Sequence, residues 1–185
     1  MVNILEPNRS EEGNKKILTT TSAFGLLRKG IIENLGTKRA KGFLLRYGWS
    51  LGVSDAKEAM LTSTSIEYLL KQASILHLNT KHIKDIQSER VIEMGDSDTL
   101  KSIIGKGKWI DSSEANVHLK HHGLSDIPVC YTLTGYASGY MSTDCRKSVI
   151  VKETSCIAKG DDIGVITDYK TVLFALTEKL KRVLV

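Results

Sequence analysis

Apolar residues recur at intervals of three and four through most of the first 76 residues, which is the spacing of one face of a helix. Ser22 is placed to cap the first helix, and Gly36 is placed to end it. The pattern therefore predicts a helical N-terminal part. The expected helices cover residues 22–35, 37–52, 54–60 and 66–73.

Beyond His77 the apolar pattern becomes typical of strands. Residues 83–94 lead into the turn sequence GDSD, and residues 99–109 run back, which predicts a β-hairpin. Residues 148–160 and 163–167 predict two final strands joined by a Gly-Asp-Asp turn. The fold class is therefore α+β.

Two further helices are expected between the hairpin and the final strands. The first has Asp111 as its N-cap, Glu114 three residues later and Gly123 as its end. The second opens at Asp126, with Pro128 in its first turn. Within it, Gly135 and Gly139 stand four residues apart and would let a neighbouring backbone come close.

The two ends of the chain differ from the middle. Residues 1–21 have few apolar positions and predict a mobile arm. Residues 169–185 carry a short a/d pattern, which predicts the start of a longer signalling helix. The pattern positions are Leu173, Leu176, Leu180 and Val183.

Composition limits the class of protein. With 185 residues, 41% of them hydrophobic, the chain can bury the core of one globular domain. It contains no signal peptide and no apolar run long enough to cross a membrane, so a cytoplasmic location is expected. The net charge of +5 is spread along the chain without a basic block, which disfavours direct binding to nucleic acid.

His118 and His122 have the spacing of two zinc ligands on one helix face. The catalytic zincin pattern needs Glu directly after the first His, but Leu119 stands there. We therefore favour a solvated basic face near a helix end, and a zinc-dependent hydrolase is a weak alternative.

The chain has three cysteines and no export signal, so reduced thiols or a metal site are expected. Glu153 and Cys156 are three residues apart on a predicted strand, where side chains point to opposite faces. A shared metal would require a bulge or bend after Thr154. From spacing alone, buried cysteines that act as small apolar side chains are about as plausible.

Three runs together carry a family resemblance: FGLLRKGIIENLGTKRAKGFLLRYGWSLGVSDA, KWIDSSEANVHLKHHGLSDIPVCYTLTGYASGY and VKETSC. In this order they closely resemble the sensory domain of XylR-type transcriptional activators, which are sigma-54-dependent regulators that detect aromatic compounds. The resemblance implies a helical dimerisation part to about residue 76. A four-vinyl-reductase-like domain follows, with a small antiparallel sheet packed by helices. The sensing domain would span residues 22–168.

The resemblance also implies an effector pocket. A His and a Trp hold the effector hydroxyl in this family, and the matching positions are His77 and Trp109, with His82 close to the first in sequence. Tyr140 matches a further pocket-lining position. Val151 stands where the family often has an aromatic residue, which leaves open an effector of another size or one that is not a phenol.

The family's structural zinc is implied as well. Cys130, Glu153 and Cys156 match three of its ligands, whereas Gly164 stands at the position of the fourth, a cysteine. Water, Asp161 or Asp162 would then complete the coordination. Cys145 matches no family ligand.

The function expected from these observations is that of a non-enzymatic, dimeric sensory domain. It would bind a small aromatic effector and control an ATPase domain that lies outside this chain. A dimerisation or docking module that has lost sensing is the alternative. An open apolar cavity beside Trp109 would favour sensing, and a filled core would favour docking.

Overall fold

The computed structural model describes residues 19–63, 65–95, 100–161 and 165–171. Helices and strands are both present, which confirms the α+β class. None of the helices within these ranges is long and apolar enough to cross a membrane. The elements, in chain order, are α1 (Thr21–Ala59), α2 (Ile66–Asn79), β1 (Asp85–Met94), β2 (Leu100–Ile110), α3 (Ser113–His122), α4 (Tyr131–Asp144), β3 (Val149–Ser155), the 3-10 helix η2 (Ile157–Lys159) and β4 (Val165–Thr171).

The strands form one antiparallel sheet in the order β1-β2-β4-β3. The predicted hairpin is confirmed as β1 and β2, and the two final strands pair with each other. Strand β4 continues to Thr171, three residues past the expected boundary at Asp168. The predicted signalling helix from Leu173 onward, and the predicted arm up to residue 18, lie outside the described residues.

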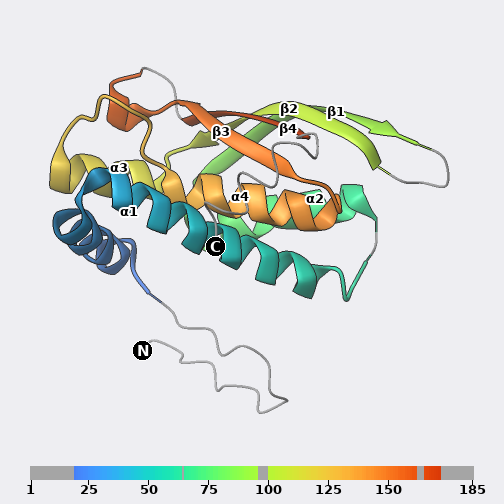
Figure 1. Cartoon of the computed structure of the whole chain (residues 1–185), viewed down its shortest axis with the longest axis horizontal. Helices are drawn as coiled ribbons and strands as arrows, with labels where there is room; N and C mark the ends of the chain where they lie inside the picture. Colours follow the sequence, from blue (N-terminus) through green and yellow to red (C-terminus); the bar gives the residue numbers. More distant parts are fainter. Residues whose placement is uncertain (1–18, 64, 96–99, 162–164, 172–185) are drawn as a thin grey trace, which may run out of the picture.

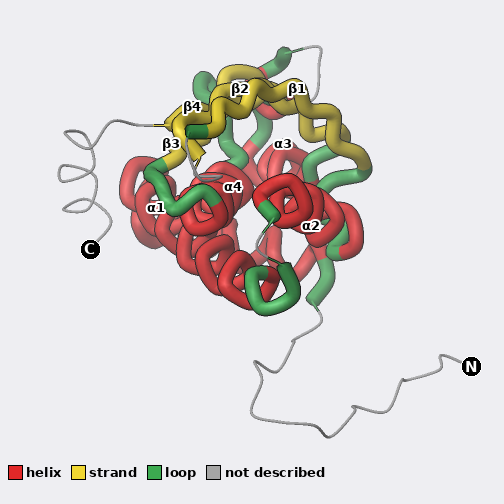
Figure 2. Tube along the Cα trace, turned by 90° about the vertical axis from the view of Figure 1, so that its right-hand side faces the viewer, coloured by secondary structure: helices red, strands yellow, loops and turns green. Residues whose placement is uncertain are grey.

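The sheet and the helices form layers (Figure 1). Helix α4 lies between the sheet and the long helix α1, and it contacts both α1 and β3. Figure 2 shows the α-helices gathered on one side of the sheet. Strand β1 forms one edge of the sheet, and most of its side chains are exposed.

Helix α1 differs in part from its prediction. Gly36 interrupts it with a non-helical backbone (φ 72°, ψ 157°), so the predicted break is confirmed. The N-cap is Thr20, whose hydroxyl accepts from the Ala23 N–H, so Ser22 was the wrong cap. The predicted stop at Gly52 is also wrong, because the helix continues through it to Ala59.

Gly52 belongs to a close contact between the backbones of α1 and α4, which run side by side. A Cβ atom on Gly52 would overlap the Tyr136 carbonyl oxygen, and one on Gly48 would overlap that of Thr132. The contact is reciprocal, because Gly135 and Gly139 stand equally close to carbonyls of α1. The close approach predicted for these two glycines is therefore confirmed.

The N-termini of α3 and α4 correct two predictions. Helix α3 is capped by Ser112 and not by Asp111. Helix α4 begins at Tyr131, so the predicted start at Asp126 is wrong. Its first N–H groups are satisfied by Glu114 of α3, whose carboxylate accepts from the backbone of Thr132 (3.0 Å) and Leu133 (3.1 Å).

Arg28 of α1 completes this junction. Its guanidinium lies 3.4 Å from Glu114 Oε1 and donates to the Val129 carbonyl at 2.9 Å, and both charged side chains are only 1% exposed. Another guanidinium nitrogen lies 2.9 Å from His118 Nδ1. His118 is buried, and burial together with Arg28 lowers its pKa to about 4. The prediction of a solvated histidine face is therefore wrong at His118.

The glycine contact predicts a large difference between two similar substitutions. Gly135→Ala would drive a methyl group into the Leu45 carbonyl oxygen. Because two backbones must separate to admit it, we expect a loss of about 3 kcal/mol or more in the free energy of unfolding. Gly30→Ala on α1 meets no atom within 4 Å, so it should raise that free energy by roughly 0.5–1 kcal/mol.

Urea unfolding followed by circular dichroism would measure both variants. Equal stabilities for Gly135→Ala and Gly30→Ala would show that α1 and α4 are not held in this close contact.

Candidate functional site

A cavity of about 70 Å³ lies between the helices and the sheet. One water needs roughly 10–15 Å³ by this kind of measure, so the space exceeds that of a single water. Its wall is mainly apolar and comes from five elements. The lining residues are Leu70, Ala73, Ser74 and His77 of α2, Ile86, Ser88 and Arg90 of β1, Gly107 and Trp109 of β2, Tyr136, Ala137, Tyr140 and Met141 of α4, and Val151 of β3.

The hairpin register explains why there is space here. Directly paired residues of an antiparallel ladder point to the same face of the sheet. Ile86 is paired with Trp109, and Ser88 is paired with Gly107. Because Gly107 has no side chain, the sheet face beside Trp109 is left open.

His77 brings a polar group into this apolar setting. The side chain is 7% exposed, and its Nε2 atom has no hydrogen-bond partner in the described part of the chain. Burial, followed by the neighbouring His82, lowers its pKa to about 3, so the imidazole is neutral at physiological pH. A neutral imidazole nitrogen can donate or accept, depending on its tautomer.

The tyrosines contribute ring surface. The Tyr140 hydroxyl donates to the Leu69 carbonyl (3.1 Å), and the Tyr136 hydroxyl donates to Asp55 (2.8 Å). Burial raises the pKa of both hydroxyls well above the usual value, so both stay protonated. The Tyr136 ring packs edge-on against His77, with 4.4 Å between centroids.

The structure brings the predicted ligand residues His77, Trp109 and Tyr140 together on this one wall. His82 is not among the lining residues, and its Nδ1 lies 2.6 Å from the Thr80 hydroxyl. Sequence reasoning missed Tyr136, although its position four residues before Tyr140 would put both on one helix face.

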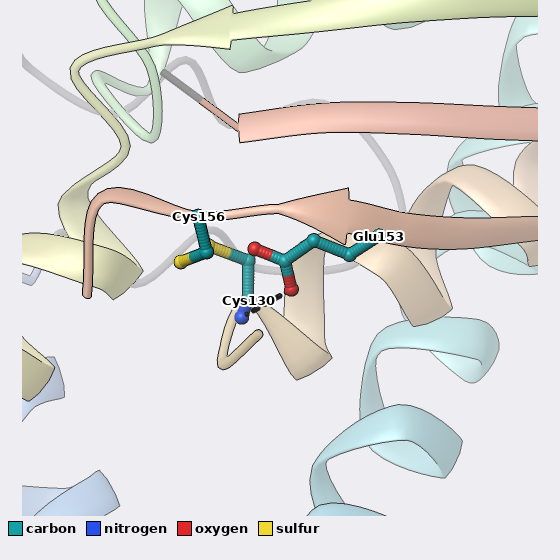
Figure 3. Close-up of side chains that lie close together, drawn as sticks. All are labelled: Cys130, Glu153 and Cys156. Carbon is teal, nitrogen blue, oxygen red and sulfur yellow. Dashed lines mark hydrogen bonds between the residues drawn. The ribbon is translucent and has the colours of Figure 1, made fainter. Parts of the chain in front are cut away.

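Cys130, Glu153 and Cys156 form a second cluster, with one ligand atom from each lying within 4.8 Å of the others (Figure 3). The two Sγ atoms are 4.0 Å apart. Strand β3 ends at Ser155, earlier than predicted, and its register shifts between Glu153 and Ser155. The bend that a shared site requires is therefore present.

The cluster is electrostatically incomplete without a cation. Glu153 Oε2 accepts from the Cys130 backbone at 2.8 Å, but the buried Oε1 has no partner among the described residues. Burial raises the pKa of Glu153 to about 9 and that of Cys130 well above its usual value. A hydrogen bond from the Cys130 thiol lowers the pKa of Cys156 to about 6. The three side chains could hold a metal ion.

The position of a fourth ligand is less complete. Asp161 Oδ2 accepts from the Cys156 backbone (2.7 Å), and its carboxylate also bonds Lys159. Asp161 therefore orders the loop around Cys156. Cys145 is buried at the end of α4 and does not belong to the cluster. Asp162 and Gly164 lie outside the described residues.

Comparisons with known proteins agree with this architecture. A family described as "Activator of aromatic catabolism" matches residues 8–90, and the four-vinyl-reductase domain family matches residues 109–166. The phenol regulator MopR of Acinetobacter guillouiae is 36% identical over 150 residues, which are 80% of this chain and 26% of that protein. The transcriptional regulatory protein XylR of Pseudomonas putida is 33% identical over 145 residues, 78% of this chain and 25% of that protein.

The chain thus spans about a quarter of the length of these curated relatives. Among solved structures, it resembles the phenol-responsive sensory domain of the transcription activator PoxR with phenol. The TM-score is 0.77 at 28% identity, covering 90% of this chain and 82% of that one. The chain belongs to the family of XylR-type sensory domains.

Proposed function

We propose that this chain is the cytoplasmic sensory domain of a sigma-54-dependent transcriptional regulator and that its cavity binds a small aromatic effector. The observation that carries the proposal is a mainly apolar cavity in which His77 presents a buried polar atom without a partner among the described residues. The relatives named for phenol support the effector class. Effector binding would control an ATPase domain of the full-length regulator.

The wall chemistry suits an aromatic ring with one polar substituent. Leu70, Met141 and Val151 offer apolar contacts to the ring. His77 and the indole N–H of Trp109 are suited to hydrogen-bond a hydroxyl, because both tyrosine hydroxyls already have partners. A ligand that supplies the missing partner of His77 would remove the cost of a buried unsatisfied group.

The alternative functions fit these observations less well. A docking module that had lost sensing would be expected to fill the space beside Trp109, whereas that space is open. For a zinc hydrolase the sequence suggested His118 and His122, but His118 is buried against Arg28. The curated relatives are regulators, which also favours sensing.

The first test of the cavity concerns His77. We expect His77→Leu to weaken phenol binding by about tenfold to a hundredfold, because the phenol hydroxyl loses its partner. Binding of toluene, which has no hydroxyl, should change little. Isothermal calorimetry would measure both ligands.

The matched control is His82→Gln, since His82 does not line the cavity. Equal losses in the His77 and His82 variants would refute a specific role for His77. If the folded parent protein bound neither phenol nor toluene, the docking alternative would replace the sensing proposal.

We further propose that Cys130, Glu153 and Cys156 bind zinc in a structural role. Two thiolates on one tetrahedral zinc stand about 3.8 Å apart, and the Sγ atoms here are 4.0 Å apart. A divalent cation would neutralise the buried Glu153 and the thiolates. Bound zinc would tie the start of α4 to the end of β3.

The zinc proposal predicts that Cys130→Ser loses the metal while Cys145→Ser retains it, since Cys145 is outside the cluster. The Cys130 variant should also be less stable by several kcal/mol, because metal binding is coupled to folding. Mass spectrometry of the metal content and thermal unfolding would measure these effects. Equal zinc contents in the two variants would contradict this ligand set.

The homodimer is proposed to form through α1. Phe43, Tyr47 and Leu51 repeat every four residues, so they share one helix face, and their exposed fractions are 44%, 44% and 38%. Exposed apolar residues in such a row are typical of an interface between protein chains.

Tyr47→Glu should therefore produce a monomer, because it buries a charge in the centre of the interface. Leu124→Glu is the control, since Leu124 is 72% exposed and lies outside this row. Sedimentation velocity would report the oligomeric state. A dimer that persists in the Tyr47 variant would place the interface elsewhere.

A further inference from the structure

The polar groups of the cavity are separated along strand β1. His77 lies near Trp109, with 6.5 Å between ring centroids, and Trp109 pairs with Ile86. Arg90 is four residues further along the strand, which corresponds to about 13 Å at the usual strand rise. The cavity therefore has a neutral hydrogen-bonding end at His77 and a cationic end at Arg90.

Arg90 is directed to the cavity by the strand geometry. Side chains two residues apart share a face, so Arg90 follows Ile86 and Ser88, and all three line the cavity. Its cross-strand partner is Gly105, which offers no side chain to cover it. Arg90 is exposed, so it lies at the mouth.

The charge of Arg90 is not matched from within the protein. In the described part of the chain, no carboxylate forms an ion pair with it. The neighbouring wall consists of uncharged residues such as Ser74, Ser88 and Leu70. A single cation at the edge of a mainly apolar cavity favours a ligand with a negative group beside an apolar body.

We infer that the effector is an aromatic acid: a ring with a hydrogen-bonding group that reaches His77 and a carboxylate that Arg90 binds. This inference rests on the proposed sensing function and narrows its ligand class. The guanidinium is planar and can hold both carboxylate oxygens. The two polar ends lie apart, which favours para substitution. The net charge of +5 would also attract an anion.

The test compares three ligands by isothermal calorimetry on the parent chain: 4-hydroxybenzoate, its neutral analogue 4-hydroxybenzamide, and phenol. We expect 4-hydroxybenzoate to bind at least about tenfold more tightly than the amide at low salt. The preference should shrink as salt is added, because Arg90 is exposed.

Two variants assign the preference to Arg90. Arg90→Gln should remove the difference between the acid and the amide and leave phenol affinity within about twofold. Lys106→Gln is the matched control, because it removes one positive charge from an exposed hairpin position that does not line the cavity. This control should keep the preference for the acid.

The outcomes separate the two levels of the proposal. If phenol binds and the amide binds as well as the acid, the aromatic-acid inference fails while the sensing proposal stands. The same holds if Lys106→Gln abolishes the preference as fully as Arg90→Gln does. If none of the three ligands binds to the folded parent, the sensing proposal fails and the inference fails with it.

Discussion

The buried ion pair between Arg28 and Glu114 is the interaction on which the rest of the structure depends. Glu114 supplies the acceptors for the first N–H groups of α4, and Arg28 neutralises that carboxylate while bonding the carbonyl of Val129. Both side chains are almost fully buried, so removal of either would leave an uncompensated charge in the interior. The pair therefore joins α1, α3 and α4 at one point.

Helix α4, fixed at its start by this pair, carries parts of both candidate sites. Cys130 is its N-cap and a member of the metal cluster, whereas Tyr136 and Tyr140 form part of the cavity wall. The glycine contact with α1 fixes the helix along its length, because neither backbone can admit a Cβ atom there. A displacement of α4 would therefore alter the metal cluster and the cavity together, which gives a binding event in the cavity a rigid element to act on.

Sequence reasoning succeeded where the signal is local. The Gly36 break, the hairpin and the close approach at Gly135 follow from residue type and spacing. It failed where the partner is distant: α4 starts later than predicted because a carboxylate from α3 caps it, and His118 is buried because Arg28 lies 90 residues away in the chain. The family resemblance, and not the spacing, singled out the three cavity residues.

The cavity wall divides into positions that the core constrains and positions that it does not. Trp109 and Tyr140 belong to the buried core, so replacing them would disturb packing as well as the cavity. Ser88 and Arg90 lie on an edge strand that is largely exposed, and they face glycines across the ladder. Exposed edge positions tolerate substitution at little cost in stability. The polarity and charge of the cavity mouth can therefore change while the scaffold stays intact, which makes β1 the element best placed to set the class of effector.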